Sequence, residues 1–221
     1  MVTATGRGWP EEGAEGAEGA HSSARPYCES EPTPVAEGAA DVRAAAHQLT
    51  RPAEVLSWAR DAVEAFDEDT YCTACFAFVR QAPSGLRVDL SLGGHPRPIL
   101  ITADGAAAVG EPGTILGMVP PRFHKVVVSV GPGDALVFYT DGVTDAPDGG
   151  DLSEEELCAV LGAAHGASPD EIIQLLRAEL GHRRPTGTRD DVALVVIRGS
   201  TEFDDEPDDE PVLAGASNGS A

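Results

Sequence analysis

Three aspartates stand where apolar, strand-like runs begin or end. Asp141 follows the run "DALVFYT", and the pair Asp190-Asp191 precedes the run "VALVVI". A carboxylate at the end of a buried strand needs compensation, because an unpaired buried charge is too costly to keep. Few Lys or Arg residues stand near these positions in the sequence, although Arg189 adjoins the second pair.

Two such carboxylates that converge at one sheet edge would suit a divalent cation. Hard cations such as Mg²⁺ and Mn²⁺ take oxygen ligands and keep water in the remaining positions. The spacing alone leaves a second interpretation open. In that interpretation Asp141-Gly142 is only a turn, and Asp190-Asp191 is only the solvated entrance to a strand.

The first element that could help to position these residues is an amphipathic helix that begins near residue 51. Thr50 can serve as its N-cap, and Pro52 lies in the first turn, where a missing N–H costs nothing. Apolar residues recur at helical spacing at Leu56, Ala59, Val63 and Phe66.

Antiparallel strands are predicted to follow. The runs "YCTACFAFVR" and "LRVDLSL" are joined by "QAPSG", whose Pro and Gly suit a hairpin. The second run alternates apolar with polar residues, so one of its faces should be in water. Further strands are "PILITA", "AAAVG", "KVVVSV" and the run before Asp141.

A helix and a strand complete the folded part. The helix is predicted over "SPDEIIQLLRAEL", where Ser168 and Glu171 have capping-box spacing. The final run, "VALVVI", is apolar on both faces and should lie centrally in a covered sheet. Strands in runs and helices in runs favour a layered α+β domain.

Composition separates this domain from two polar ends. Residues 1–42 are rich in Gly, Ala, Glu, Pro and Ser without periodicity, which predicts a disordered low-complexity leader. Residues 200–221 predict an acidic disordered tail, which leaves residues 43–199 as the folded domain. With 42% hydrophobic residues, the chain can bury one core of ordinary size.

The formal net charge of −22 argues against nucleic acid and anionic membranes as partners, because both would repel it. No apolar run is long enough to span a membrane, and no secretory signal is visible. The four cysteines form no disulfide-dense pattern, so the expected location is cytoplasmic.

Three segments in order, "GGHPRPIL", "GPGDALVFYTDGVTDA" and "TRDDVALVVIR", resemble bacterial PPM-type (SpoIIE-like) metal-dependent serine/threonine phosphatases. The resemblance covers about residues 43 to 198. It implies an α-β-β-α sandwich of two antiparallel sheets flanked by helices, with two Mg²⁺ or Mn²⁺ ions between the sheets. In that family the metals activate a water that attacks the phosphorus of phosphoserine or phosphothreonine in line.

Carried over by motif, Asp141 and Asp190 match metal-binding aspartates of the family. Gly142 would let the backbone turn closely beside the metal. His95 and Asp191 are candidates to line the site, although Asp191 should point to the opposite face of its strand. The implied partner is a phosphorylated protein, such as an anti-sigma-factor antagonist.

The acidic segments with which members of the family begin, "GGDxxD"-like and "GDVxGxG", have no counterpart in this sequence. We therefore expect an N-terminally incomplete domain that lacks two strands and the bridging carboxylate. Two functions follow as alternatives. One is a phosphatase with reduced or lost activity unless another chain supplies the missing part. The other is a non-catalytic remnant that binds a phosphoprotein or regulatory partner.

Overall fold

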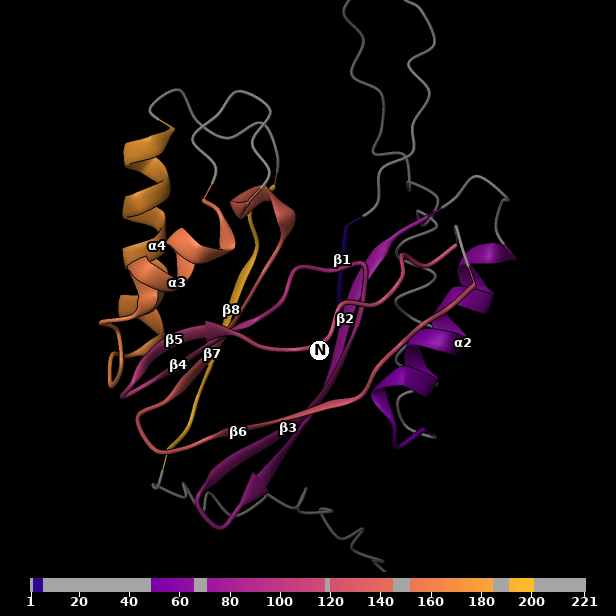
Figure 1. Ribbon diagram of the computed structural model, residues 1–221, viewed down its shortest axis with the longest axis horizontal. Coiled ribbons are helices and arrows are strands. Elements are labelled where there is room, and N and C mark those ends of the chain that lie inside the picture. Colours follow the sequence, from indigo (N-terminus) through magenta and orange to yellow (C-terminus); the bar gives the residue numbers. More distant parts are fainter. Residues whose placement is uncertain are drawn as a thin grey trace, which may run out of the picture.

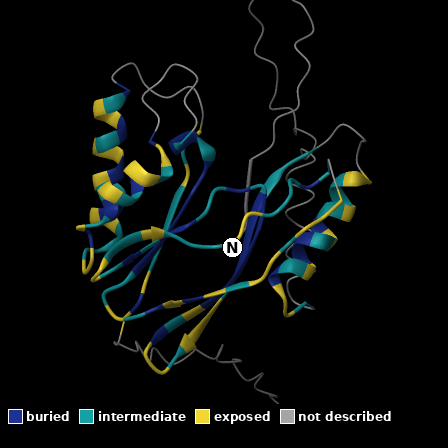
Figure 2. Cartoon of the chain, viewed as in Figure 1, coloured by how far each residue is buried: buried dark blue, intermediate teal, exposed yellow. Residues whose placement is uncertain are grey.

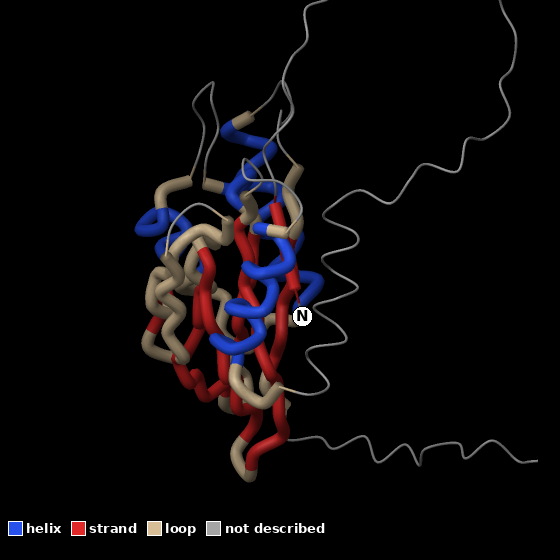
Figure 3. The backbone as a smooth tube through the Cα atoms, turned by 90° about the vertical axis from the view of Figure 1, so that its right-hand side faces the viewer, coloured by secondary structure: helices blue, strands red, loops and turns tan. Residues whose placement is uncertain are grey.

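The computed structural model describes residues 2–5, 49–65, 71–117, 120–144, 152–184 and 191–200. These residues form two four-stranded antiparallel sheets with helices on the two outer sides (Figures 1 and 3). The predicted α+β sandwich is therefore confirmed. No helix in these ranges is long and apolar enough to cross a bilayer.

The first sheet has the strand order β1-β2-β3-β6. Its strands are β1 (Val2–Thr5), β2 (Thr73–Ala82), β3 (Gly85–Gly93) and β6 (Val126–Val130). Helix α2 (Pro52–Glu64) packs on β2 and β3. The predicted hairpin joins β2 to β3 through a two-residue turn, and Gly85 after it has a φ of +117°, which favours glycine.

The second sheet has the order β5-β4-β7-β8. Its strands are β4 (Ile99–Thr102), β5 (Gly105–Ala108), β7 (Ala135–Tyr139) and β8 (Leu194–Arg198). Helices α3 (Glu154–Leu161) and α4 (Pro169–Arg183) cover it, and each begins with a complete capping box. The box of α4 was predicted, whereas the same signal at Ser153 and Glu156 was overlooked and α3 was missed.

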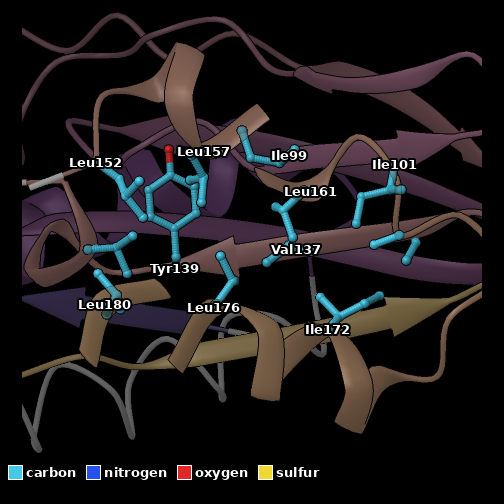
Figure 4. Packing of buried hydrophobic residues seen from close by; sticks show 13 residues of the cluster. Ile99, Ile101, Val137, Tyr139, Leu152, Leu157, Leu161, Ile172, Leu176 and Leu180 are labelled. Carbon is cyan, nitrogen blue, oxygen red and sulfur yellow. The ribbon is translucent and has the colours of Figure 1, made fainter. Parts of the chain in front are cut away.

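Strand β7 is buried along its whole length, because both of its faces meet apolar side chains (Figure 2). Leu136 and Phe138 join the cluster between the sheets, together with residues of β3 and β6. Figure 4 shows Val137 and Tyr139 on the other face, among leucines and isoleucines of α3, α4 and β4. A strand held on both faces is a rigid support for the residues that follow it.

Four sequence predictions need correction or qualification. The N-cap of α2 is Arg51 rather than Thr50, because Pro52 occupies the first turn and keeps the preceding residue extended. The polar face of β3 is not wet at Asp89 and Ser91, since both are buried. Strand β8 is half-buried and stands at the end of its sheet, not in the centre.

The fourth concerns the leader. Residues 2–5 form β1, which pairs with β2 over the register Val2↔Phe76 to Thr5↔Thr73. The predicted disorder does not describe these residues, which read Val-Thr-Ala-Thr, and valine and threonine are common in strands. The rest of the leader, residues 43–48 of the predicted domain, and the tail beyond residue 200 lie outside the described residues.

Candidate functional site

The turn after β7 carries Asp141, the first predicted site residue. Residues Asp141–Val143 form the single-turn 3₁₀ helix η1, directly beyond the buried strand. The Asp141 Oδ1 atom is buried and has no hydrogen-bond partner. Within the described ranges, the buried side-chain atoms without a partner belong to Ser91, His95 and Asp141. A buried acceptor in this condition calls for an explanation, because most are satisfied in folded proteins.

The backbone just before β8 lies against this turn. Thr140 donates from its hydroxyl to the Asp191 carbonyl at 3.0 Å and accepts from the Ala193 amide at 3.0 Å. Its own amide donates to the Ala193 carbonyl at 3.1 Å. The two aspartate-bearing segments therefore come together, as the sequence suggested. Asp190 lies outside the described residues, and the Asp191 side chain is exposed.

Gly142 permits this close approach. A Cβ atom at this position would lie 2.5 Å from the Asp191 carbonyl oxygen and 3.0 Å from its carbon. Backbone atoms cannot give way as the end of a flexible side chain can, so any other residue would push the segments apart. The glycine after Asp141 is therefore required by the packing of two chain segments.

Arg184 also holds the turn that carries Asp141. It is buried just beyond α4, and its guanidinium donates to the Gly142 carbonyl at 2.6 Å and to the Val143 carbonyl at 3.0 Å. Charge-assisted hydrogen bonds of this kind are stronger than neutral ones. This residue is not predictable from the sequence, because nothing in the helix-terminal segment "GHRRP" indicates which carbonyls an arginine will reach.

His95 lies in the loop between β3 and β4, near the same end of β7. The side chain is 5% exposed, and neither ring nitrogen has a hydrogen-bond partner. Burial lowers the pKa of His95 to about 4, and the nearby Tyr139 backbone opposes this shift without forming a hydrogen bond of ordinary geometry. The imidazole is therefore neutral at neutral pH.

An ion pair anchors the loop that carries His95. Arg97 donates from Nε to Glu154 at 2.9 Å, which ties the loop to the first turn of α3. Both side chains are more than a third exposed, so this ion pair contributes little to the stability of the fold. It restrains the position of the loop.

Asp141 fits a cation ligand, although the described residues do not complete a metal site. Its free Oδ1 is the type of acceptor that Mg²⁺ or Mn²⁺ binds. Within the described ranges, no group of three His, Cys, Asp or Glu side chains is placed to hold a metal. Residues outside those ranges, such as Asp190, and water are available as further oxygen ligands for a cation at Asp141.

Comparison with known proteins identifies the family of the chain. The family model for stage II sporulation protein E (SpoIIE) matches residues 38–200. A structure of the RsbU and RsbW domains of a Mycobacterium tuberculosis protein is 26% identical over 77% of this chain and 48% of its own, with a TM-score of 0.59. No curated protein sequence matches.

Two further structures share the fold at lower identity. The PP2C phosphatase domain of Bacillus subtilis SpoIIE, with a fragment of its regulatory domain, is 15% identical over 73% of this chain and 48% of its own, with a TM-score of 0.60. RsbX in complex with magnesium is 15% identical over 78% and 77%, with a TM-score of 0.55. The chain thus spans about half the length of the first two structures.

Proposed function

The chain belongs to the SpoIIE family, and we propose that it is a metal-dependent phosphatase for phosphoserine or phosphothreonine in a regulatory protein. The observation that carries the proposal is the buried, unpartnered Oδ1 of Asp141 at the end of β7. An oxygen left without a donor in a rigid, well-packed place is expected where a cation completes its coordination.

In this proposal Asp141 and Asp190 hold the cations, of which the family uses two. When bound, Mg²⁺ or Mn²⁺ would supply an activated water and neutralise charge on the transferring phosphoryl group. The described residues position the turn that carries Asp141. Thr140 fixes the Asp141 turn to the segment before β8, and Arg184 fixes the same turn to the end of α4.

His95 has a different part in the proposed site. Because its imidazole is buried and neutral, it adds no positive charge that would compete with a cation. Asp191 presents its backbone carbonyl, rather than its carboxylate, to the Asp141 turn. We therefore propose His95 and Gly142 as site-lining residues and place Asp191 in a supporting position.

A phosphorylated regulator of sigma-factor type is the proposed substrate. One similar structure combines an RsbU domain with an RsbW domain, and another is the SpoIIE phosphatase. The magnesium complex of RsbX supports the choice of divalent cation. The proposed partner is therefore a phosphoprotein of the class of anti-sigma-factor antagonists.

The test is hydrolysis of a phosphoserine peptide by the full chain, with Mn²⁺ or Mg²⁺ and with EDTA. We expect activity that requires the metal and falls at least about 100-fold in Asp141→Asn, beyond the range typical of residues that only support a metal ligand. Asp104→Asn, in the exposed β4–β5 hairpin, is the matched control and should retain activity. Hydrolysis indifferent to both the metal and Asp141→Asn would contradict the proposal.

One observation favours a second candidate, a non-catalytic binding protein. The acidic "GGDxxD"-like and "GDVxGxG" segments of the family have no counterpart in this sequence. If this candidate is correct, the full chain should retain a phosphorylated regulator in a pull-down without hydrolysing it. Equal retention of the unphosphorylated regulator would count against it.

A further inference from the structure

The outer side of the first sheet carries a cluster of basic side chains, here called the basic face: Arg80, Arg87 and Lys125. They surround the buried carboxylate of Asp89. Arg87 Nε lies 2.8 Å from Asp89 Oδ1, and Lys125 Nζ and Arg80 Nη1 lie 2.7 and 3.4 Å from Oδ2. Three cations share a single carboxylate, so the cluster retains an excess of positive charge.

The basic face remains open to solvent. The side chains of Arg80, Arg87 and Lys125 are 47%, 49% and 36% exposed, whereas that of Asp89 is 5% exposed. Val127, opposite Asp89 on β6, is 44% exposed, so helix α2 does not cover this part of the sheet. A positive, partly apolar surface is unusual in a chain whose formal net charge is −22.

The acidic tail leaves the domain beside this surface. Gly199 forms a bridge with Pro132, and a Cβ atom on Gly199 would lie 2.0 Å from the Gly131 carbonyl oxygen. Gly131 directly follows the end of β6, where Ser129 pairs with Arg87. Figure 1 likewise shows the end of β8 close to the turn that joins β6 to β7.

The sequence after Ser200 has complementary charge and sufficient reach. The stretch 201–210, "TEFDDEPDDE", contains seven carboxylates and no basic residue. An extended chain advances roughly 3.3 Å per residue, so a few residues span the distance from the end of β6 to Arg87 and Arg80. The acidic leader starts from β1, at the opposite edge of the same sheet from β6.

We propose that residues 202–210 of the tail bind the basic face of the same molecule. Individual surface ion pairs are weak, but the short tether gives the tail a high effective concentration, and several carboxylates face several cations. The interaction should weaken as salt rises, because screening acts on exposed charges. This inference does not depend on the proposed phosphatase activity.

Lys125 is the sole lysine in the sequence, which allows a direct test. A carbodiimide couples an amine to a carboxylate in contact with it, and forms an amide with loss of water. We expect peptide mass spectrometry of the full chain at low salt to find Lys125 joined to residues 202–210 within monomers. The yield should fall at least about fivefold in 0.5 M NaCl. Lys125→Arg keeps the charge and should give no such product.

A second measurement tests whether the tail binds the basic face, rather than only coming close enough for Lys125 to react with it. A tail variant with Asp204→Asn, Asp205→Asn, Asp208→Asn and Asp209→Asn should shift the Nε–H resonances of Arg80 and Arg87. The matched control replaces Glu11, Glu12, Glu15 and Glu18 of the leader with glutamine, and should leave these resonances in place.

Three results of the coupling experiment would overturn the proposal. They are coupling of Lys125 to Asp89 alone, coupling to the leader as efficiently as to the tail, and coupling only between two molecules. The last result would identify a second copy of the chain as the occupant of the basic face. Arginine resonances that do not respond to the tail variant would also contradict it.

Discussion

Asp89 lies on a strand of the first sheet, and Asp141 follows a strand of the second. The two carboxylates differ in whether basic side chains compensate their charge. Asp89 is buried on β3, and burial raises its pKa, but hydrogen bonds and charges from Lys125 and Arg87 outweigh this effect and lower it. Asp141 keeps a buried Oδ1 without any donor. A carboxylate that serves only the fold is compensated by the chain itself. The open oxygen of Asp141 is therefore the observation on which the proposed cation depends.

The largest expected effect is a contrast in stability between two matched variants. Asp89→Asn should lower the free energy of unfolding by about 3 kcal/mol, because a buried carboxylate loses its charge-assisted hydrogen bonds to Arg87 and Lys125. Asp141→Asn should change it by less than about 1 kcal/mol without metal, because no ion pair is lost. Urea unfolding with EDTA measures both. If both variants lost the same free energy of unfolding, the two carboxylates would not differ in their contribution to stability.

Gly142→Ala should have the next largest effect. The new methyl group would collide with the Asp191 backbone, at a cost of about 2 kcal/mol in unfolding free energy. Gly181→Ala is the matched control, since a Cβ atom there meets nothing within 4 Å and an alanine favours the helix. Thermal unfolding should show a lower Tm for the first variant and an equal or higher Tm for the second. The reverse order would refute the close approach at Gly142.

Arg184→Gln should cost about 1.5 kcal/mol, because the buried Gly142 and Val143 carbonyls lose charged donors. Arg177→Gln, on the exposed side of α4, should be close to neutral. Chemical unfolding compares the two variants, and metal affinity should fall only in Arg184→Gln if this arginine positions Asp141. If Arg184→Gln changed neither the free energy of unfolding nor the metal affinity, Arg184 would have no role in positioning Asp141.

The effect that is smallest at neutral pH is a dependence on pH, which grows as the solution becomes more acidic. His95 is neutral when folded, with a pKa of about 4, whereas the unfolded chain binds a proton near pH 6.5. Stability is therefore fully present above pH 6.5 and falls by about 1.4 kcal/mol per pH unit below it, down to about pH 4. The difference between the native chain and His95→Gln in urea unfolding should show this slope. If the free energies of unfolding of the native chain and His95→Gln changed with pH in the same way, His95 would not be neutral in the folded protein.

Local signals predicted much of the fold from the sequence. The hairpin at residues 83–84 and the capping box of Ser168 and Glu171 depend on neighbouring residues, so sequence spacing suffices. The buried state of Asp89 could not be predicted in this way. It depends on Lys125, which β6 brings alongside from a distant part of the sequence.

The same limit applies to the candidate site. Asp141 and Gly142 stood out because a polar turn interrupts a strongly apolar run, and the structure explains the glycine by the approach of Asp191. Arg184 did not stand out, since its role depends on where α4 ends in space. The edge position of β8 was also missed, because an apolar strand does not reveal how many neighbours it has.

Titration of Mn²⁺ into the full chain and its variants, followed by calorimetry, tests most directly whether Asp141 binds a metal. We expect binding by the native chain, binding at least about tenfold weaker in Asp141→Asn, and unchanged binding in Asp104→Asn. Equal Mn²⁺ affinity in the native chain and Asp141→Asn would contradict metal binding by Asp141.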